Sequence, residues 1–150
     1  MVNDKSHLTA ITRRALSLPT AFLKQAGLLV GIMLDYGCGR GFDCSALCCD
    51  GYDPHYRPAL TGVAYDTIFC QYVLNTIPDP AKRQDVLWTI QGLLAPSGLA
   101  FITVRNDKFN EGYTSRGTWQ GNVRLELPIV KTCSGFVMYR LDKDAVLRNK

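Results

Sequence analysis

The chain has 150 residues, of which 47% are hydrophobic and 20% charged, and its formal net charge is +4. This length and balance are typical of one globular domain, and they exclude a disordered or fibrous chain. No apolar run reaches the about 18 residues that a membrane span needs. The polar segment before His7 also lacks the apolar core of a secretion signal. We therefore expect residues 1–150 to form a single domain of a cytoplasmic protein.

The chain contains six cysteines, which we expect to be free thiols. Disulfides are rare inside cells, so a small buried apolar role is the better interpretation. Cys44, Cys48 and Cys49 lie close together, but a zinc site needs a second group of ligands, and His55 is the only histidine nearby. The sequence therefore predicts no metal site.

The first two thirds of the chain predict alternating helices and strands. A first helix is expected between Ser17 and Gly27, because proline favours the first turn of a helix and glycine follows its end. Asp79 and Pro80 predict the start of another, with an N-cap followed by proline. Its apolar positions fall on one helical face: Val86, Leu87, Ile90, Leu93 and Leu94. A short helix is expected over 42–49, and strands over 31–36, 51–53, 65–72 and 99–104.

The last third of the chain has a different pattern. Two strands are expected over 123–130 and 135–141, and the short connection between them implies an antiparallel pair. The predicted class is therefore α/β, with a mostly parallel sheet that ends in a C-terminal antiparallel hairpin. The stretch 106–122 is predicted to be a lid or binding loop.

Positive charge is concentrated near the C-terminus. Residues 1–100 carry eight basic and eight acidic side chains, whereas residues 101–150 carry nine basic and five acidic ones. This excess indicates either an anionic partner or a solvated basic face.

The sharpest motif is a run of three alternating glycines after the first predicted strand. Gly37, Gly39 and Gly41 permit a tight turn and close approach of a ligand, and a helix N-terminus follows them. Asp35 precedes the first glycine by two residues. An acid there would repel a pyrophosphate, and the spacing differs from the G-x-G-x-x-G of dinucleotide sites. The pattern suits a ligand with a cationic end, such as the ammonium group of an amino acid.

A second acid, Asp53, follows the next predicted strand. An acid at this place in a βαβ unit accepts hydrogen bonds from the hydroxyl groups of a ribose. A glycine turn and a ribose acid together are more specific than either alone. The alternative is that both segments are simple turns.

These motifs resemble class I S-adenosylmethionine (SAM)-dependent methyltransferases. The Asp35-x-Gly37-x-Gly39-x-Gly41 run is similar to their first motif, and 65–68 and 93–99 are similar to their later strand signatures. More narrowly, 9–13, 35–41, 51–58 and 72–80 resemble methyltransferases associated with DNA phosphorothioation systems. The resemblance implies a compact Rossmann-like methyltransferase sheet. It is shortened in the middle, because Tyr65 follows Asp53 by only twelve positions, where the family has another helix and strand.

The resemblance also implies a set of cofactor-binding residues. Asp35 would reach the amino group of SAM, and Asp53 would hold its ribose. The adenine side would be completed by Tyr52, Pro54, His55 or the N-terminal segment. The expected cofactor-binding residues are Asp35, Tyr36, Gly37, Cys38, Gly39, Gly41, Asp53, Pro54, Gln71 and Tyr72.

No catalytic residue is predicted. The sequence after the third strand lacks the Asn/Asp-Pro-Pro-Tyr/Phe motif for amino methylation, and Cys70 is better interpreted as a core residue than as a nucleophile. A substrate lip is expected where cations and aromatic rings can grip phosphates and bases. Its members are Arg13, Arg105, Asp107, Lys108, Tyr113 and Trp119, although the same loop could be an ordinary surface with Trp119 tucked against the sheet.

Three functions remain open from the sequence. The first is a SAM-dependent methyltransferase acting on an unidentified acceptor, with nucleic acid or a nucleotide as a candidate. The second is a non-catalytic SAM-binding module or partner subunit. A protein partner or a homo-oligomer is compatible with both of these functions. The third, a nicotinamide-dependent reductase, is opposed by Asp35 and by the glycine spacing.

Overall fold

The computed structural model describes residues 5–107 and 110–148. Two short 3₁₀ turns, η1 (Ser6–Thr9) and η2 (Leu74–Thr76), accompany three α-helices: α1 (Leu18–Gln25), α2 (Phe42–Ala46) and α3 (Pro80–Leu93). The strands are β1 (Met33–Tyr36), β2 (Asp50–Tyr52), β3 (Tyr65–Gln71), β4 (Leu94–Arg105), β5 (Gly112–Tyr113), β6 (Trp119–Gln120), β7 (Ile129–Thr132) and β8 (Phe136–Asp142).

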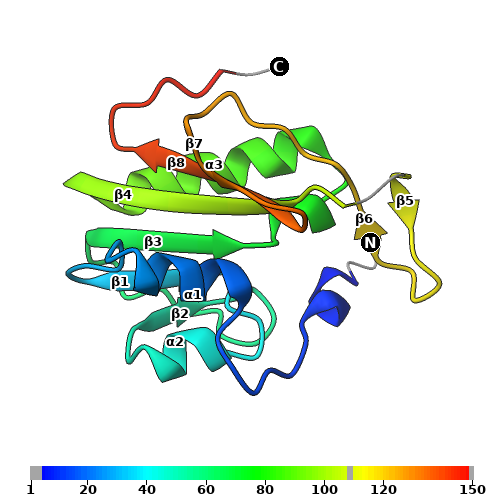
Figure 1. Ribbon diagram of the computed structural model, residues 1–150, viewed down its shortest axis with the longest axis horizontal. Coiled ribbons are helices and arrows are strands. Elements are labelled where there is room, and N and C mark those ends of the chain that lie inside the picture. The colour runs from blue at the N-terminus through cyan, green and yellow to red at the C-terminus, as the bar shows by residue number, and fades with distance from the viewer. Residues whose placement is uncertain (1–4, 108–109, 149–150) are drawn as a thin grey trace.

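Six of these strands form one sheet in the order β2-β1-β3-β4-β8-β7 (Figure 1). Strands β2, β1, β3 and β4 are parallel to one another, and β8 runs antiparallel to both β4 and β7. The predicted α/β class is therefore confirmed, with a mostly parallel sheet and an antiparallel C-terminal hairpin. The two remaining strands, β5 and β6, pair separately.

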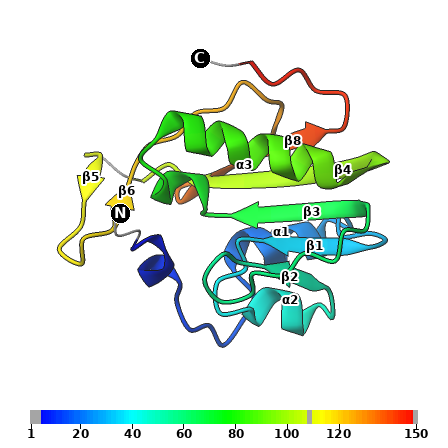
Figure 2. The same cartoon turned by 180° about the vertical axis from the view of Figure 1, so that it is seen from behind.

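Helices cover both faces of the sheet (Figures 1 and 2). One face packs under α3, where Leu87 and Ile90 of the predicted apolar stripe are buried; Leu94, predicted as the last residue of that stripe, is buried as the first residue of β4. The other face carries α1 and α2, and Leu23 of α1 packs there against Phe69 and Phe101. Successive strand residues point to opposite faces, so each strand contributes side chains to both layers.

The first helix begins and ends close to its predicted limits. Ser17 precedes it as N-cap residue, Pro19 lies in its first turn, and Gly27 follows its end with φ 69°. The second predicted helix is shorter than expected, since α2 ends at Ala46. Asp79 caps α3 by accepting a hydrogen bond from the N–H of Ala81 at 2.9 Å.

The strand predicted over 123–130 is wrong for most of its length. Pairing with β8 begins only at Ile129, directly after Pro128. Proline has no N–H to donate to the ladder, so it confines the strand to the residues that follow it. The segment before it still packs on the core through Val123, Leu125 and Leu127.

The loop predicted over 106–122 contains a small hairpin that the sequence analysis missed. Its strands β5 and β6 bring Tyr113 and Trp119 opposite each other, with ring centroids 5.5 Å apart. The hydroxyl groups of Thr114 and Thr118 lie 2.6 Å apart and close the turn. In both ribbon views this hairpin lies beside the N-terminal segment (Figures 1 and 2).

Two further features bear on the class of protein. None of the described helices is long and apolar enough to cross a membrane. All six cysteines are free thiols, and Cys44 and Cys70 are buried.

Candidate functional site

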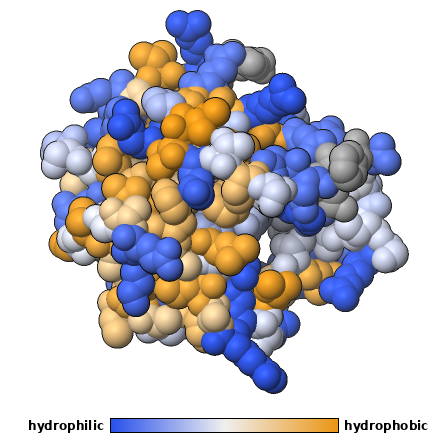
Figure 3. All heavy atoms as spheres, in the orientation of Figure 1, coloured by the Kyte–Doolittle hydropathy of each residue, from blue (hydrophilic) through white to orange (hydrophobic). Residues whose placement is uncertain are grey.

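The candidate site lies at one edge of the sheet. Strands β1 to β4 are parallel, so their carboxyl ends meet there, which is where open α/β sheets bind ligands. The glycine turn follows β1, Asp53 follows β2, and Tyr72 follows β3. The space-filling view shows the molecule hollowed on the side where the N-terminal segment faces the end of β3 (Figure 3).

The glycine turn has the backbone geometry that its sequence predicts. Gly37, Gly39 and Gly41 have φ values of 82°, 53° and 84°, in the left-handed region that glycine adopts at low cost. The N–H groups of Gly37 and Cys38 both donate to the carbonyl of Tyr52, at 2.7 and 2.9 Å. The turn is thus anchored on the end of β2.

Asp53 holds the same turn through its side chain. Its Oδ2 accepts a hydrogen bond from the N–H of Gly39 at 3.0 Å, and its Oδ1 accepts from the N–H groups of His55 and Tyr56. The two motifs that the sequence set apart are therefore directly bonded. A carboxylate offers about four acceptor positions, so three are filled and one remains for a ligand.

Asp35 is a buried acid beside the glycine turn. Its exposed fraction is 4%, and burial raises the pKa of its carboxyl group well above the usual value. The negative charge of Asp43 raises this pKa further, whereas the positive charges of Arg13 and Arg57 lower it. Arg13, predicted at the substrate lip, thus acts on Asp35 electrostatically. A cation bound here would favour the charged form of the acid.

Asp43 and Arg57 belong to this neighbourhood, although the sequence analysis did not select them. Asp43 is buried in α2, and its two oxygens accept hydrogen bonds from the N–H and the hydroxyl of Ser17. It thereby ties α2 to the start of α1. The guanidinium of Arg57 lies over Gly41, where a side chain would leave it no room. No sequence signal marked either contact, because both join segments far apart in the chain.

Gln71 ends β3 and Tyr72 follows it, at the carboxyl edge of the parallel strands. The Oε1 atom of Gln71 is buried and has no hydrogen-bond partner. Tyr72 has φ 61°, a conformation that costs a residue other than glycine about 1–3 kcal/mol and that clusters at functional sites. Burial raises the pKa of the Tyr72 hydroxyl, so this group is neutral near pH 7.

The side chains of two predicted cofactor residues make contacts within the protein. Tyr36 follows Asp35 on β1, so its side chain points to the opposite face and is buried against Tyr52 in the α3 layer. Only its backbone borders the glycine turn. The Cys38 thiol donates to the carbonyl of Gly39, and burial raises its pKa. A protonated thiol is a poor nucleophile.

Cys70 is fully buried in the layer under α3, and burial raises the pKa of its thiol. The structure therefore places it as the core residue that the sequence analysis preferred.

The N-terminal segment covers part of the turn. Ala10 lies against Gly39, and the ring of His7 stacks on that of His55 with centroids 3.9 Å apart. Pro54 and His55 are exposed in the turn that follows Asp53. This segment therefore lies beside Asp53, at the start of the short connection from Asp53 to Tyr65.

The predicted substrate lip is only partly assembled. Arg105 and Asp107 form a bidentate ion pair with each other, at 2.8 and 2.9 Å. Tyr113 is 71% exposed, and its ring lies against that of Trp119, whose Nε1 atom is buried without a hydrogen-bond partner. Lys108 lies outside the described residues.

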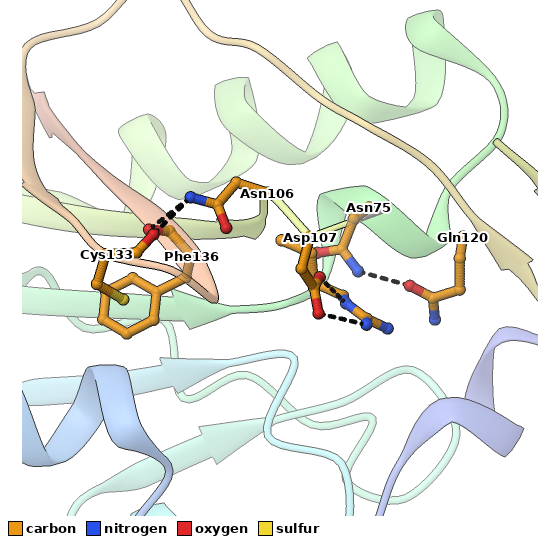
Figure 4. Close-up of polar contacts among 7 residues, drawn as sticks. Asn75, Asn106, Asp107, Gln120, Cys133 and Phe136 are labelled. Atoms are coloured by element: carbon orange, nitrogen blue, oxygen red, sulfur yellow. Dashed lines mark hydrogen bonds and ion pairs between the residues drawn. The ribbon is translucent and has the colours of Figure 1, made fainter. Parts of the chain in front are cut away.

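A polar pair that was not predicted joins η2 to this lip. Asn75 of η2 is 1% exposed, and its Nδ2 donates to Oε1 of Gln120 at 3.0 Å (Figure 4). The Oδ1 atom of Asn75 is buried without a partner. Asn106 anchors the lip on its other side by donating to the carbonyls of Cys133 and Phe136. The signal that could have selected Asn75 from the sequence is its place as a polar residue within the apolar run after β3.

Comparisons with known proteins support the fold assignment. No known family and no curated protein matches the chain by sequence. A solved structure of Burkholderia thailandensis 1,6-didemethyltoxoflavin-N1-methyltransferase contains bound 1,6-didemethyltoxoflavin and S-adenosylhomocysteine (SAH). It is similar at a TM-score of 0.60 and 14% identity, and the match covers 92% of this chain and 78% of that one. A DhpI–SAH complex is similar at a TM-score of 0.57 and 15% identity, covering 81% of each chain. The fold is that of Rossmann-like methyltransferases.

Proposed function

We propose that this protein is a SAM-dependent methyltransferase. The observation that carries the proposal is the buried carboxyl group of Asp35 beside the glycine turn, at the carboxyl edge of a methyltransferase-type sheet. A buried acid of raised pKa is stabilised in its charged form by a cationic ligand. The ammonium group of a methionine moiety is such a ligand. Structures of the same fold that contain SAH add support.

The remaining residues fit the other parts of the cofactor. Asp53 keeps one acceptor position for a ribose hydroxyl, and Gln71 has a buried oxygen without a partner. SAM, when bound, supplies an electrophilic methyl group on its sulfonium. The contribution of the protein is then positioning and electrostatics. Tyr72, with its neutral hydroxyl, can donate a hydrogen bond near the end of β3.

The adenine side is formed differently from the usual fold in this proposal. Tyr52 is turned into the core against Tyr36, so it does not complete the pocket. The exposed Pro54 and His55, together with η1, are the groups that border Asp53 on the shortened side. A cytoplasmic location, a nucleic-acid acceptor and a role beside DNA phosphorothioation rest on the sequence alone.

Calorimetric titration with SAM and SAH, beside NADH, tests the proposal. We expect SAM and SAH to bind and NADH not to bind. The Asp53→Ala variant should lose at least about tenfold in affinity, because it removes a charge-assisted hydrogen bond worth about 1.5–3 kcal/mol. Asp85→Ala, which removes an exposed acid on α3, is the matched control and should bind as the wild type does. Equal affinity in the two variants would refute the assignment of Asp53.

A non-catalytic SAM-binding module is the second candidate. It is favoured by the shortened stretch between Asp53 and Tyr65 and by the N–H groups of the glycine turn, which are already bonded within the protein. Formation of SAH from SAM with an acceptor would exclude it. Binding of SAM without turnover on any acceptor would favour it over the enzyme.

A further inference from the structure

A hollow of about 270 Å³ lies between η1, the end of β4 and the β5–β6 hairpin. Two guanidinium groups, Arg105 and Arg116, line it together with hydroxyl groups from the hairpin turn. None of its eight lining residues is acidic, and Leu8 adds an apolar patch. We infer that this hollow binds the methyl acceptor, and that the acceptor is a small molecule with a phosphate or carboxylate group. The inference rests on the proposed function.

The charge in the hollow comes mainly from one side chain. Arg105 is already paired with Asp107, so its charge is largely neutralised. Arg116 makes no ion pair or hydrogen bond within residues 5–107 and 110–148. It stands beside Thr114, Ser115 and Thr118. One of the two threonine hydroxyl groups donates to the other, which leaves the second threonine and Ser115 as donors. A cation flanked by hydroxyl donors is suited to bind the oxygens of an anionic group.

The inner wall connects the hollow to the cofactor site. Gln120 lines the hollow and accepts a hydrogen bond from Asn75 (Figure 4). Asn75 retains a buried Oδ1 without a partner, which can accept a hydrogen bond from a ligand. Two residues earlier, Val73 packs directly over Gly37 of the glycine turn. An acceptor in the hollow would therefore lie next to the cofactor, as direct transfer between bound groups requires.

The shape of the site favours a small molecule over a nucleic acid. A nucleic-acid surface needs cations along a stripe or patch that follows the phosphate backbone. Of the two guanidinium groups that line the hollow, only that of Arg116 is unpaired, and the volume of the hollow is near the lower end of the range for small-molecule sites, about 300–1,000 Å³. Arg124 is exposed, as Arg116 is, but it does not line the hollow, so it is the matched control.

Ligand titration by NMR on the SAH-saturated protein tests the inference. Phenyl phosphate and benzoate are the probes, because together they distinguish a phosphate from a carboxylate, and benzyl alcohol is the neutral control. We expect at least one anion to bind and the alcohol not to bind. Arg116→Gln should lower the affinity for the anion about tenfold, because it removes one charge-assisted hydrogen bond. Arg124→Gln should leave its affinity unchanged.

Asn75→Asp provides a second variant of nearly equal size. A carboxylate on the inner wall should repel the anion and lower its affinity at least several-fold. The circular dichroism spectrum checks that the fold is intact. Equal weakening by Arg116→Gln and Arg124→Gln, or tighter binding of a single-stranded oligonucleotide that depends on both arginines, would overturn the inference. SAH affinity is measured in every variant. Unchanged SAH binding with no anion binding rejects the acceptor site alone, whereas no SAH binding by the wild type rejects the proposed function.

Discussion

Replacement of Asp35 by asparagine is expected to weaken SAH binding at least tenfold and to stabilise the unliganded protein at neutral pH. The loss of affinity follows from removal of a buried charge that faces the ligand ammonium, an interaction of about 1.5–3 kcal/mol. The gain in stability follows from burial, because ionised Asp35 is disfavoured by desolvation and by the charges of Asp43 and Asp53. Asparagine has a similar shape and never ionises.

The pH dependence of this gain has a definite sign. The pKa of Asp35 is higher in the folded than in the unfolded chain, so the folded state binds the proton more tightly. The stability that this proton contributes is fully present below the unfolded pKa and is lost as pH rises through the folded pKa. Urea denaturation should therefore show wild type and Asp35→Asn diverging as pH rises from about 4.

Two outcomes would contradict this assignment of Asp35. Wild-type affinity of Asp35→Asn for SAH would remove the acid from the cofactor site. A variant that is less stable than the wild type at every pH would show that the carboxylate is a structural group. Calorimetry in buffers of different ionisation enthalpy adds a check, because SAH binding should release a proton where unliganded Asp35 is protonated.

Replacement of Gly37 by alanine is expected to destabilise the protein by about 2–5 kcal/mol. The residue has φ 82°, a left-handed conformation that costs an L-residue about 1–2 kcal/mol. A methyl group there would also overlap Cγ2 of Val73, so the turn or η2 must shift. The displaced turn should lose SAH affinity as well. Chemical denaturation and calorimetry measure the two effects.

Two further variants separate the causes at Gly37. Gly62 has a similar φ of 76° with open space around it, so Gly62→Ala should cost only about 1–2 kcal/mol. Val73→Ala removes the clashing methyl groups, so it should recover part of the stability of Gly37→Ala in a double-mutant cycle. Additive effects of the two substitutions would mean that Val73 does not press on the turn.

The sequence by itself determined those features that depend on neighbours along the chain. Proline and glycine at the ends of α1, and the Asp79 cap with the apolar stripe of α3, were predictable because helix ends and faces follow local spacing. The glycine turn was predictable for the same reason, since three alternating glycines permit a conformation that other residues disfavour. Alternation of strands and helices then determined the mostly parallel sheet.

Only the tertiary structure decided what depends on contacts between distant segments. Asp35 and Tyr36 are adjacent in sequence, but successive strand residues point to opposite faces of the sheet. Asp35 therefore lies beside the glycine turn, and Tyr36 lies in the core. The bond from Gly39 to Asp53, the position of Arg57 over Gly41 and the pairing of Asn75 with Gln120 each join separate segments. Their positions follow from sheet order and packing, which residue spacing does not specify. The acceptor hollow, formed by η1, β4 and the β5–β6 hairpin, therefore became visible only in the folded chain.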